Sequence, residues 1–174
     1  MRKMRSIDEA TAPDPESVIA TLDELVTSLG WRLHAFNRDD ESVGLVSLGH
    51  DPFFEQIIWI YDTKRALVRC LLVGRERIPA NREAIIFELC ARINDGLIFG
   101  CAEYSFSDCA LVFRDTAPVG AGNLKEILTD LSGRVLNLGA RYRPVIAAAL
   151  AGSSAIEAMT YENSSEGNGA PEAR

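Results

Sequence analysis

The sequence predicts an α+β fold: an antiparallel sheet of about six strands with helices packed on one face. Two observations lead to this prediction. Short apolar strand patterns follow one another through brief polar turns, and three longer stretches carry apolar residues at helical spacing. Consecutive strands joined by short turns pair antiparallel, and the helices then pack against the sheet. The predicted order is α-ββββ-α-ββ-α, and no internal repeat stands out.

The first helix is predicted to start at Asp14 and to end before Gly30. Asp14 can accept hydrogen bonds from the first turn, and Pro15 suits the first helical position. Glycine readily adopts the left-handed conformation that ends a helix. One apolar face follows the helical period: Val18, Ile19, Leu22, Leu25, Val26 and Leu29.

Four strands are expected next, at residues 31–37, 43–48, 55–61 and 66–73. Polar residues form the turns after the first and third of them. Pro52 cannot continue a ladder of hydrogen bonds, so it separates the second strand from the third.

The third strand is apolar on both sides. Ile58 and Ile60 point one way, and the opposite set comprises Ile57, Trp59 and Tyr61. Helices on one side of the sheet alone would leave one of these sets in water. We therefore expect the set around Trp59 to be covered by a tail, a loop or another chain.

A second helix is predicted at residues 80–95, with Gly96 ending it, and two strands follow at 97–106 and 109–114. The last helix begins at Asn123, with Glu126 at capping-box spacing. Pro144 lacks a backbone donor, so a kink or break is expected at residues 140–144, followed by a short helix at 145–151.

The chain of 174 residues is expected to form one domain at residues 14–151. Residues 1–13 are polar, Pro13 and Pro15 mark their end, and residues 152–174 are rich in Ser, Gly, Asn and Glu. We predict a disordered N-terminal lead and a disordered acidic C-terminal tail.

The formal net charge of −7 disfavours nucleic acid as a partner, because phosphates would be repelled. Residues 6–17 are too polar for a secretory signal, and no apolar run is long enough to span a membrane. These features indicate a cytoplasmic protein.

No catalytic, cofactor or metal site is predicted. The only histidine bases are His34 and His50, and no recognised catalytic or phosphate-binding motif is present. The four cysteines lack metal-ligand spacing and are interpreted as small buried hydrophobes. Cys101 and Cys109 flank a predicted hairpin turn, and a disulfide between them is possible in an oxidising compartment.

The candidate partner-binding residues surround the third strand: Phe53, Phe54, Ile57, Trp59 and Tyr61. Exposed aromatic side chains at a strand end are typical of a contact surface, although they could instead fold back into the core. A second feature is the basic cluster of Arg75, Arg77 and Arg82, with Lys64, Arg65 and Arg69 nearby. Either an acidic ligand or a solvated face would account for it.

Two stretches resemble the YbjN-like family of bacterial sensory transduction regulators, whose fold is similar to that of type III secretion chaperones. One is NREAIIFELCARINDGLIFGCAEYSFSDCALVFR at residues 81–114, and the other is RYRPVIAAALAG at residues 141–152. The resemblance covers residues 15–152 and carries no catalytic residues over. It implies a cytoplasmic bacterial protein that contacts other proteins. The GHDPFF loop and the two tails depart from the family pattern.

The sequence therefore predicts a non-enzymatic protein-binding regulator or chaperone-like module, working as a homodimer or on a client protein. Strand addition at a sheet edge is one way to bind an extended peptide. Two alternatives stay open: a dedicated secretion chaperone for one client, and an enzyme with an unrecognised site.

Overall fold

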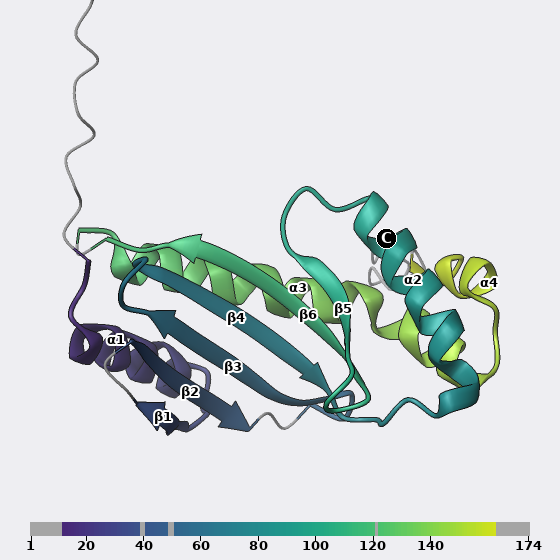
Figure 1. The fold of residues 1–174 in the computed structure, drawn as a ribbon, viewed down its shortest axis with the longest axis horizontal. Coiled ribbons are helices and arrows are strands. Elements are labelled where there is room, and N and C mark those ends of the chain that lie inside the picture. Colours follow the sequence, from purple (N-terminus) through teal and green to yellow (C-terminus); the bar gives the residue numbers. More distant parts are fainter. Residues whose placement is uncertain (1–11, 39–40, 49–50, 121, 163–174) are drawn as a thin grey trace, which may run out of the picture.

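The computed structural model describes residues 12–38, 41–48, 51–120 and 122–162. Within these ranges the fold is α+β, as predicted, and all strands belong to one antiparallel sheet in the order β1-β2-β3-β4-β6-β5 (Figure 1). The strands are β1 Leu33–Arg38, β2 Ser42–Leu48, β3 Phe54–Asp62, β4 Leu67–Gly74, β5 Cys101–Ser105 and β6 Ala110–Pro118. The helices are α1 Pro15–Ser28, η1 Ala80–Arg82, α2 Glu83–Asp95, α3 Leu124–Ala151 and α4 Ala155–Met159.

Helix α1 begins and ends as the sequence predicts. The Asp14 carboxylate accepts hydrogen bonds from the backbone N–H of Glu16 (3.3 Å) and of Ser17 (3.2 Å). These bonds satisfy donors that have no partner within the helix. Gly30 follows the last turn with φ +74°, which a residue with a Cβ rarely adopts.

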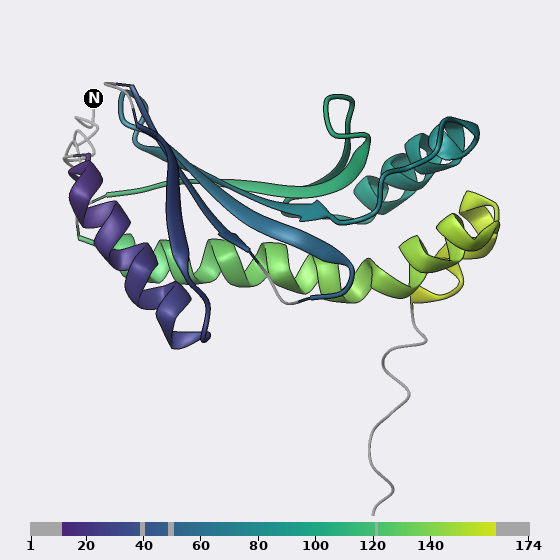
Figure 2. The ribbon, with the colours of Figure 1, turned by 90° about the horizontal axis from the view of Figure 1, so that it is seen from below.

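Helices α1 and α3 lie on the same side of the curved sheet (Figure 2), which we call the inner face. Helix α2 packs on β5 at the other end, and its buried residues join the same core. Trp59 donates from Nε1 to Ser132 Oγ of α3 (2.9 Å), and the Tyr61 hydroxyl donates to the carbonyl of Pro13 (2.6 Å). The core therefore lies between the sheet and α3.

The predicted orientation of β3 is wrong. Ile57, Trp59 and Tyr61 face the helices of their own chain and are at most 2% exposed, whereas Ile58 and Ile60 point to the opposite side. Strand alternation separates two sets of residues but cannot say which set meets the helices. The larger aromatic set occupies the helix side, where it buries the most apolar area.

Helix α3 runs through Pro144 from Leu124 to Ala151, so the break predicted as one of two outcomes at residues 140–144 does not occur. Buried residues stand on both sides of the proline: Tyr142, Val145, Ile146 and Ala149. Burying several such side chains outweighs the roughly 3 kcal/mol that an internal proline costs a helix.

The predicted disordered tail contains a helix in its described part. In α4, Ser154 Oγ accepts from the backbone N–H of Glu157 (3.3 Å), and the Glu157 carboxylate accepts from the N–H of Ser154 (2.9 Å). This is a capping box, and Ala155 and Ala158 are buried beneath it. Residues 1–11 and 163–174, also predicted to be disordered, lie outside the described residues.

Candidate protein-interaction surface

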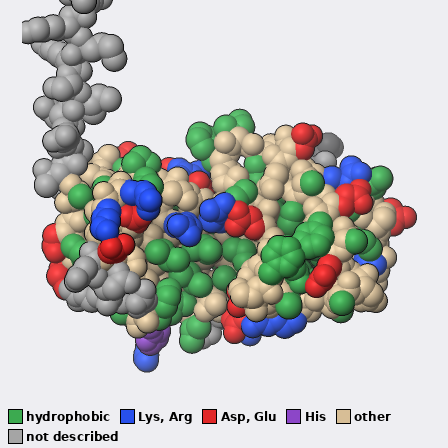
Figure 3. All heavy atoms as spheres, viewed as in Figure 1, with side chains coloured by type: hydrophobic (Ala, Val, Ile, Leu, Met, Phe, Trp, Pro, Cys, Tyr) green, Lys and Arg blue, Asp and Glu red, His purple; other side chains and the backbone are tan. Residues whose placement is uncertain are grey.

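The second side of the sheet, the outer face, carries an apolar centre. Antiparallel pairing places Val46 and Leu71 on either side of Ile58, and Val73 lies beside Val112. Within the described ranges no helix packs on this side, and Figure 3 shows hydrophobic side chains across its middle. We define the outer-face patch by these half-buried or buried residues: Val46, Ile58, Ile60, Leu71, Val73 and Val112.

Glycine and an aromatic ring meet at one end of the outer face. A Cβ added to Gly44 of β2 would overlap the ring of Phe36, so this ring lies directly on the glycine. Phe36 is nonetheless 57% exposed. The ring therefore extends the apolar surface of the patch onto the edge strand β1.

Charged groups of both signs border the patch. Arg65 pairs with Asp62 (2.7 Å), and Lys64 pairs with Glu41 at the same corner. Arg69 is exposed and forms no ion pair with any described residue. Exposed pairs of this kind stabilise a fold by at most about 1 kcal/mol, so their arrangement matters more for recognition than for stability.

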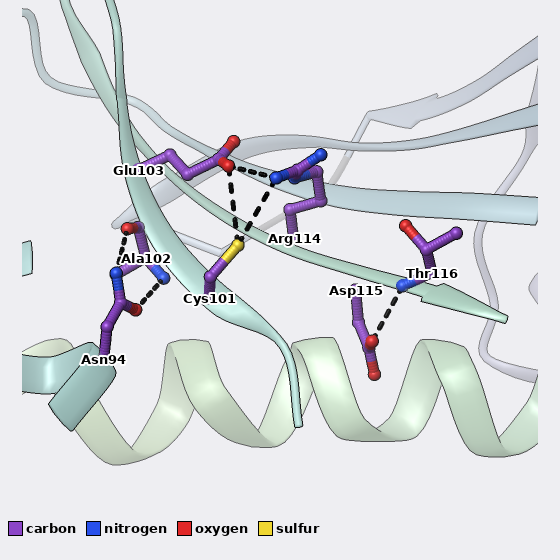
Figure 4. A network of polar contacts seen from close by, with 7 residues as sticks. All are labelled: Asn94, Cys101, Ala102, Glu103, Arg114, Asp115 and Thr116. Atoms are coloured by element: carbon purple, nitrogen blue, oxygen red, sulfur yellow. Dashed lines mark hydrogen bonds and ion pairs between the residues drawn. The ribbon is translucent and has the colours of Figure 1, made fainter. Parts of the chain in front are cut away.

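Cys101 belongs to a polar network on the outer face (Figure 4). Its thiol donates to Glu103 Oε1 (3.5 Å) and accepts from Arg114 Nη2 (3.7 Å), while Arg114 also pairs with Glu103. Burial, followed by the nearby Glu103 carboxylate, raises the pKa of the Cys101 thiol. A thiol that stays protonated is a poor nucleophile, so this network does not support cysteine catalysis.

Both edges of the sheet are modified in ways that hinder strand addition. On β5, the Asn94 side chain accepts from the backbone N–H of Ala102 (2.7 Å) and donates to its carbonyl (3.0 Å), as Figure 4 shows. It thus takes the place that a neighbouring strand would occupy. On β1, a register shift between Ala35 and Asn37 interrupts the ladder. Bulges and blocked backbone groups both discourage edge pairing.

Replacing Asn94 by alanine should open the β5 edge. The variant loses two hydrogen bonds and leaves a buried backbone N–H without a partner, so the free energy of unfolding should fall by about 1–2 kcal/mol. Urea unfolding measures this change, and light scattering should detect new, concentration-dependent association. Asp95→Ala, at the next position of α2, is the matched control and should do neither. If Asn94→Ala and Asp95→Ala unfold at the same urea concentration, Asn94 does not stabilise the β5 edge.

The remaining candidate partner-binding residues, Phe53 and Phe54, are half-buried and buried, respectively. Phe54 is buried and packs edge-on against Phe113, with ring centres 6.2 Å apart. Phe53 is half-buried beneath the guanidinium of Arg143, which lies 5.1 Å from the ring centre. The segment with Phe53 and Phe54 therefore folds back toward the core. Both aromatic rings already contact side chains of the same chain.

The arginines of the basic cluster at the start of α2 donate hydrogen bonds to backbone carbonyls of the same chain. Arg82 Nε donates to the carbonyl of Ala149 (3.1 Å), and its Nη2 donates to that of Ser153 (2.6 Å). Arg75 donates to the carbonyl of Asp51 (3.1 Å), and Arg77 donates to that of Asp108. Arg82 thus caps the carboxyl end of α3, where a positive charge is favourable.

His34 is exposed in an open hollow of about 460 Å³ together with Arg32 and Trp31, and His50 lies outside the described residues. The described residues that line the hollow around His34 include no acidic or nucleophilic side chain. No group of three potential metal ligands occurs in the described part of the chain. The helices found there also include none with the length and apolar character needed to cross a bilayer.

The disulfide that the sequence left possible between Cys101 and Cys109 is absent, and both cysteines are free. Cys101 lies opposite Arg114, whereas Cys109 adjoins Ala110, whose partner is Ser105. Four residues along a strand span about 13 Å, well beyond the reach of a disulfide. Cys70 and Cys90 are buried, as predicted, but Cys101 is only half-buried and Cys109 is exposed.

Sequence reasoning missed two apolar surfaces. The first is the outer-face patch, whose members come from four strands and meet only through the register. The second is a group of three aromatic rings, in which Tyr104 contacts Phe87 and Phe106 with centres 5.1 and 5.2 Å apart. Phe106 and Phe87 are among the exposed large side chains. Only the alternation in β3 signals the first surface.

Comparison with known proteins gave no match: no family model, no curated protein and no solved structure is similar to this chain. The resemblance to the YbjN-like family therefore stays a prediction.

Proposed function

We propose that this protein is a non-enzymatic, protein-binding regulator or chaperone-like module of the YbjN-like type, acting in the bacterial cytoplasm. The observation that supports this most directly is the one-sided cover of its sheet. Helices bury the inner face, while the apolar outer-face patch has no covering helix among the described elements. Apolar surfaces of this kind, bordered by charge, are typical of protein contact sites.

The blocked edges favour docking on the face over strand addition. Asn94 already pairs with the backbone of Ala102, and the register shift distorts β1. A partner that lies across the outer face needs no free backbone groups. Two sheets stack face to face about 10 Å apart when their facing side chains are apolar, which suits the residues of the patch.

We propose a second copy of this chain as the partner. A two-fold contact is made by the same surface on both copies, so it requires a self-complementary patch. The outer face offers an apolar centre with the cation of Arg69 at one border and the carboxylate of Glu103 at another. A secretion client bound at the same place is the second candidate. An enzyme has less support, because the described residues that line the hollow around His34 supply neither an acid nor a nucleophile.

The double variant Ile58→Glu/Leu71→Glu tests the proposal. Light scattering of the wild-type protein at micromolar concentration should give twice the chain mass of 19.0 kDa, and the variant should give the mass of one chain. Burying carboxylates in an apolar contact is strongly unfavourable. Circular dichroism should be unchanged, since both positions are half-buried on the outer side.

Ile98→Glu is the matched control, because Ile98 is 89% exposed on the loop between α2 and β5. This control should remain dimeric. If light scattering gives the wild-type protein the mass of one chain at every concentration up to about 100 µM, the proposed dimer is overturned. A double variant that stays dimeric would show that the copies meet elsewhere.

A further inference from the structure

A cavity of about 170 Å³ lies between the inner face of the sheet and the middle of α3. Its walls are mainly apolar: Phe54 and Leu72 come from the sheet, Leu136 from α3, and Trp31 from the segment before β1. An enclosed apolar cavity of about 150 Å³ in another protein takes up benzene, whereas the cavity here also opens to solvent beside Ala140. The volume here therefore fits one aromatic ring.

Arg143 brings a polar group to this cavity. Its Nη2 forms an ion pair with Asp51, and its guanidinium lies over the ring of Phe53. Asp51 is itself fixed, because its Oδ1 accepts from the backbone N–H of Phe53 (2.7 Å) and of Phe54 (3.3 Å). The pair holds the loop that begins at Asp51 against α3 and neutralises the charge of the arginine.

Arg143 also has a buried donor that the ion pair does not use. Its Nε is buried and has no hydrogen-bond partner among the described residues. A buried donor without an acceptor is unfavourable, and a ligand oxygen that reached it would relieve this penalty. A carboxylate is poorly suited to the position, because Asp51 already supplies one negative charge to the same guanidinium and a second would be repelled.

We propose that this cavity is a binding site for a compact, uncharged ligand that consists of one aromatic ring bearing a carbonyl oxygen. The ring fills the apolar space, and the carbonyl oxygen accepts from Arg143 Nε. The site lies on the helix-covered side of the sheet, so it does not depend on the proposed contact at the outer face.

Benzamide is the probe, with benzoate and toluene as comparison ligands. Titration of the full chain, followed by ligand-observed NMR, should give saturable binding of benzamide with a Kd of about 1 mM, as expected for so small a ligand. Benzoate should bind at least about tenfold more weakly because of Asp51. Toluene should also bind about tenfold more weakly, because it leaves Nε without an acceptor.

Ala140→Phe tests the location of the site. Ala140 lines the cavity but is exposed, so the larger side chain can close the opening without disturbing the core. Binding of benzamide should be lost. Asn137→Phe, at another exposed position of α3, is the matched control and should bind as the wild type does.

Arg143→Lys tests the hydrogen bond separately from the cavity. Lysine keeps a charge beside Asp51 but has no Nε donor at this position, so benzamide should lose its advantage over toluene while toluene binding is retained. Absence of saturable benzamide binding to the wild type up to about 10 mM would overturn the proposal. Equal binding by Ala140→Phe and the wild type would also overturn it.

Discussion

Replacing Trp59 by alanine is expected to lower the free energy of unfolding by about 3–5 kcal/mol, the loss typical of a fully buried large aromatic residue. Trp59 is 2% exposed beneath α3, and its Nε1 donates to Ser132 Oγ at 2.9 Å. The substitution leaves a cavity between the sheet and α3. It also leaves the buried Ser132 hydroxyl without this donor, which adds to the loss.

Ile60→Ala is the control for this prediction, because Ile60 is the next residue of the same strand and faces the outer side. Its truncation should lower the free energy of unfolding by about 1 kcal/mol, since the side chain is only half-buried. Chemical denaturation of both variants gives the comparison. A larger loss for Ile60→Ala than for Trp59→Ala would reverse the assignment of the two faces.

The difference between these neighbours shows what local sequence can predict in this fold. Residues 55–61 alternate in a way that predicts a strand with two apolar sides, and both sides are present in β3. Alternation is symmetrical, however, so it cannot identify the side on which α3 packs. That choice depends on contacts such as Trp59 to Ser132, which join residues 73 positions apart.

The start of α1 was predicted correctly, whereas the capping box predicted at Asn123 and the break predicted at Pro144 do not form in α3. Asp14 caps α1 through bonds to residues two and three positions away, so the signal is local and the prediction is confirmed. Pro144 has an equally local preference, but buried neighbours on α3 override it. Asn94 and Ala102 similarly come together only when the chain after α2 turns back and places β5 against this helix. Sequence spacing alone therefore could not reveal that this edge is closed.

Two glycines of α3 are expected to respond in opposite directions to the same substitution. Gly133→Ala should stabilise the protein by about 0.5–1 kcal/mol, because an added Cβ meets no atom within 4 Å and alanine favours the helix. Gly139→Ala should destabilise it by about 1–2 kcal/mol. A Cβ at Gly139 would overlap Leu72 Cδ2 and would lie 2.9 Å from Phe54 Cε2, so overpacking exceeds the gain in helix propensity.

Urea unfolding of the two variants measures this pair of effects, with the slope of the transition as a check that both unfold in the same manner. The reason for the difference is geometric. Gly139 is buried where α3 crosses Phe54 and Leu72, and the absent side chain lets the helix approach the sheet. Stabilisation by both substitutions would mean that α3 lies further from β4 than the close contact at Gly139 requires.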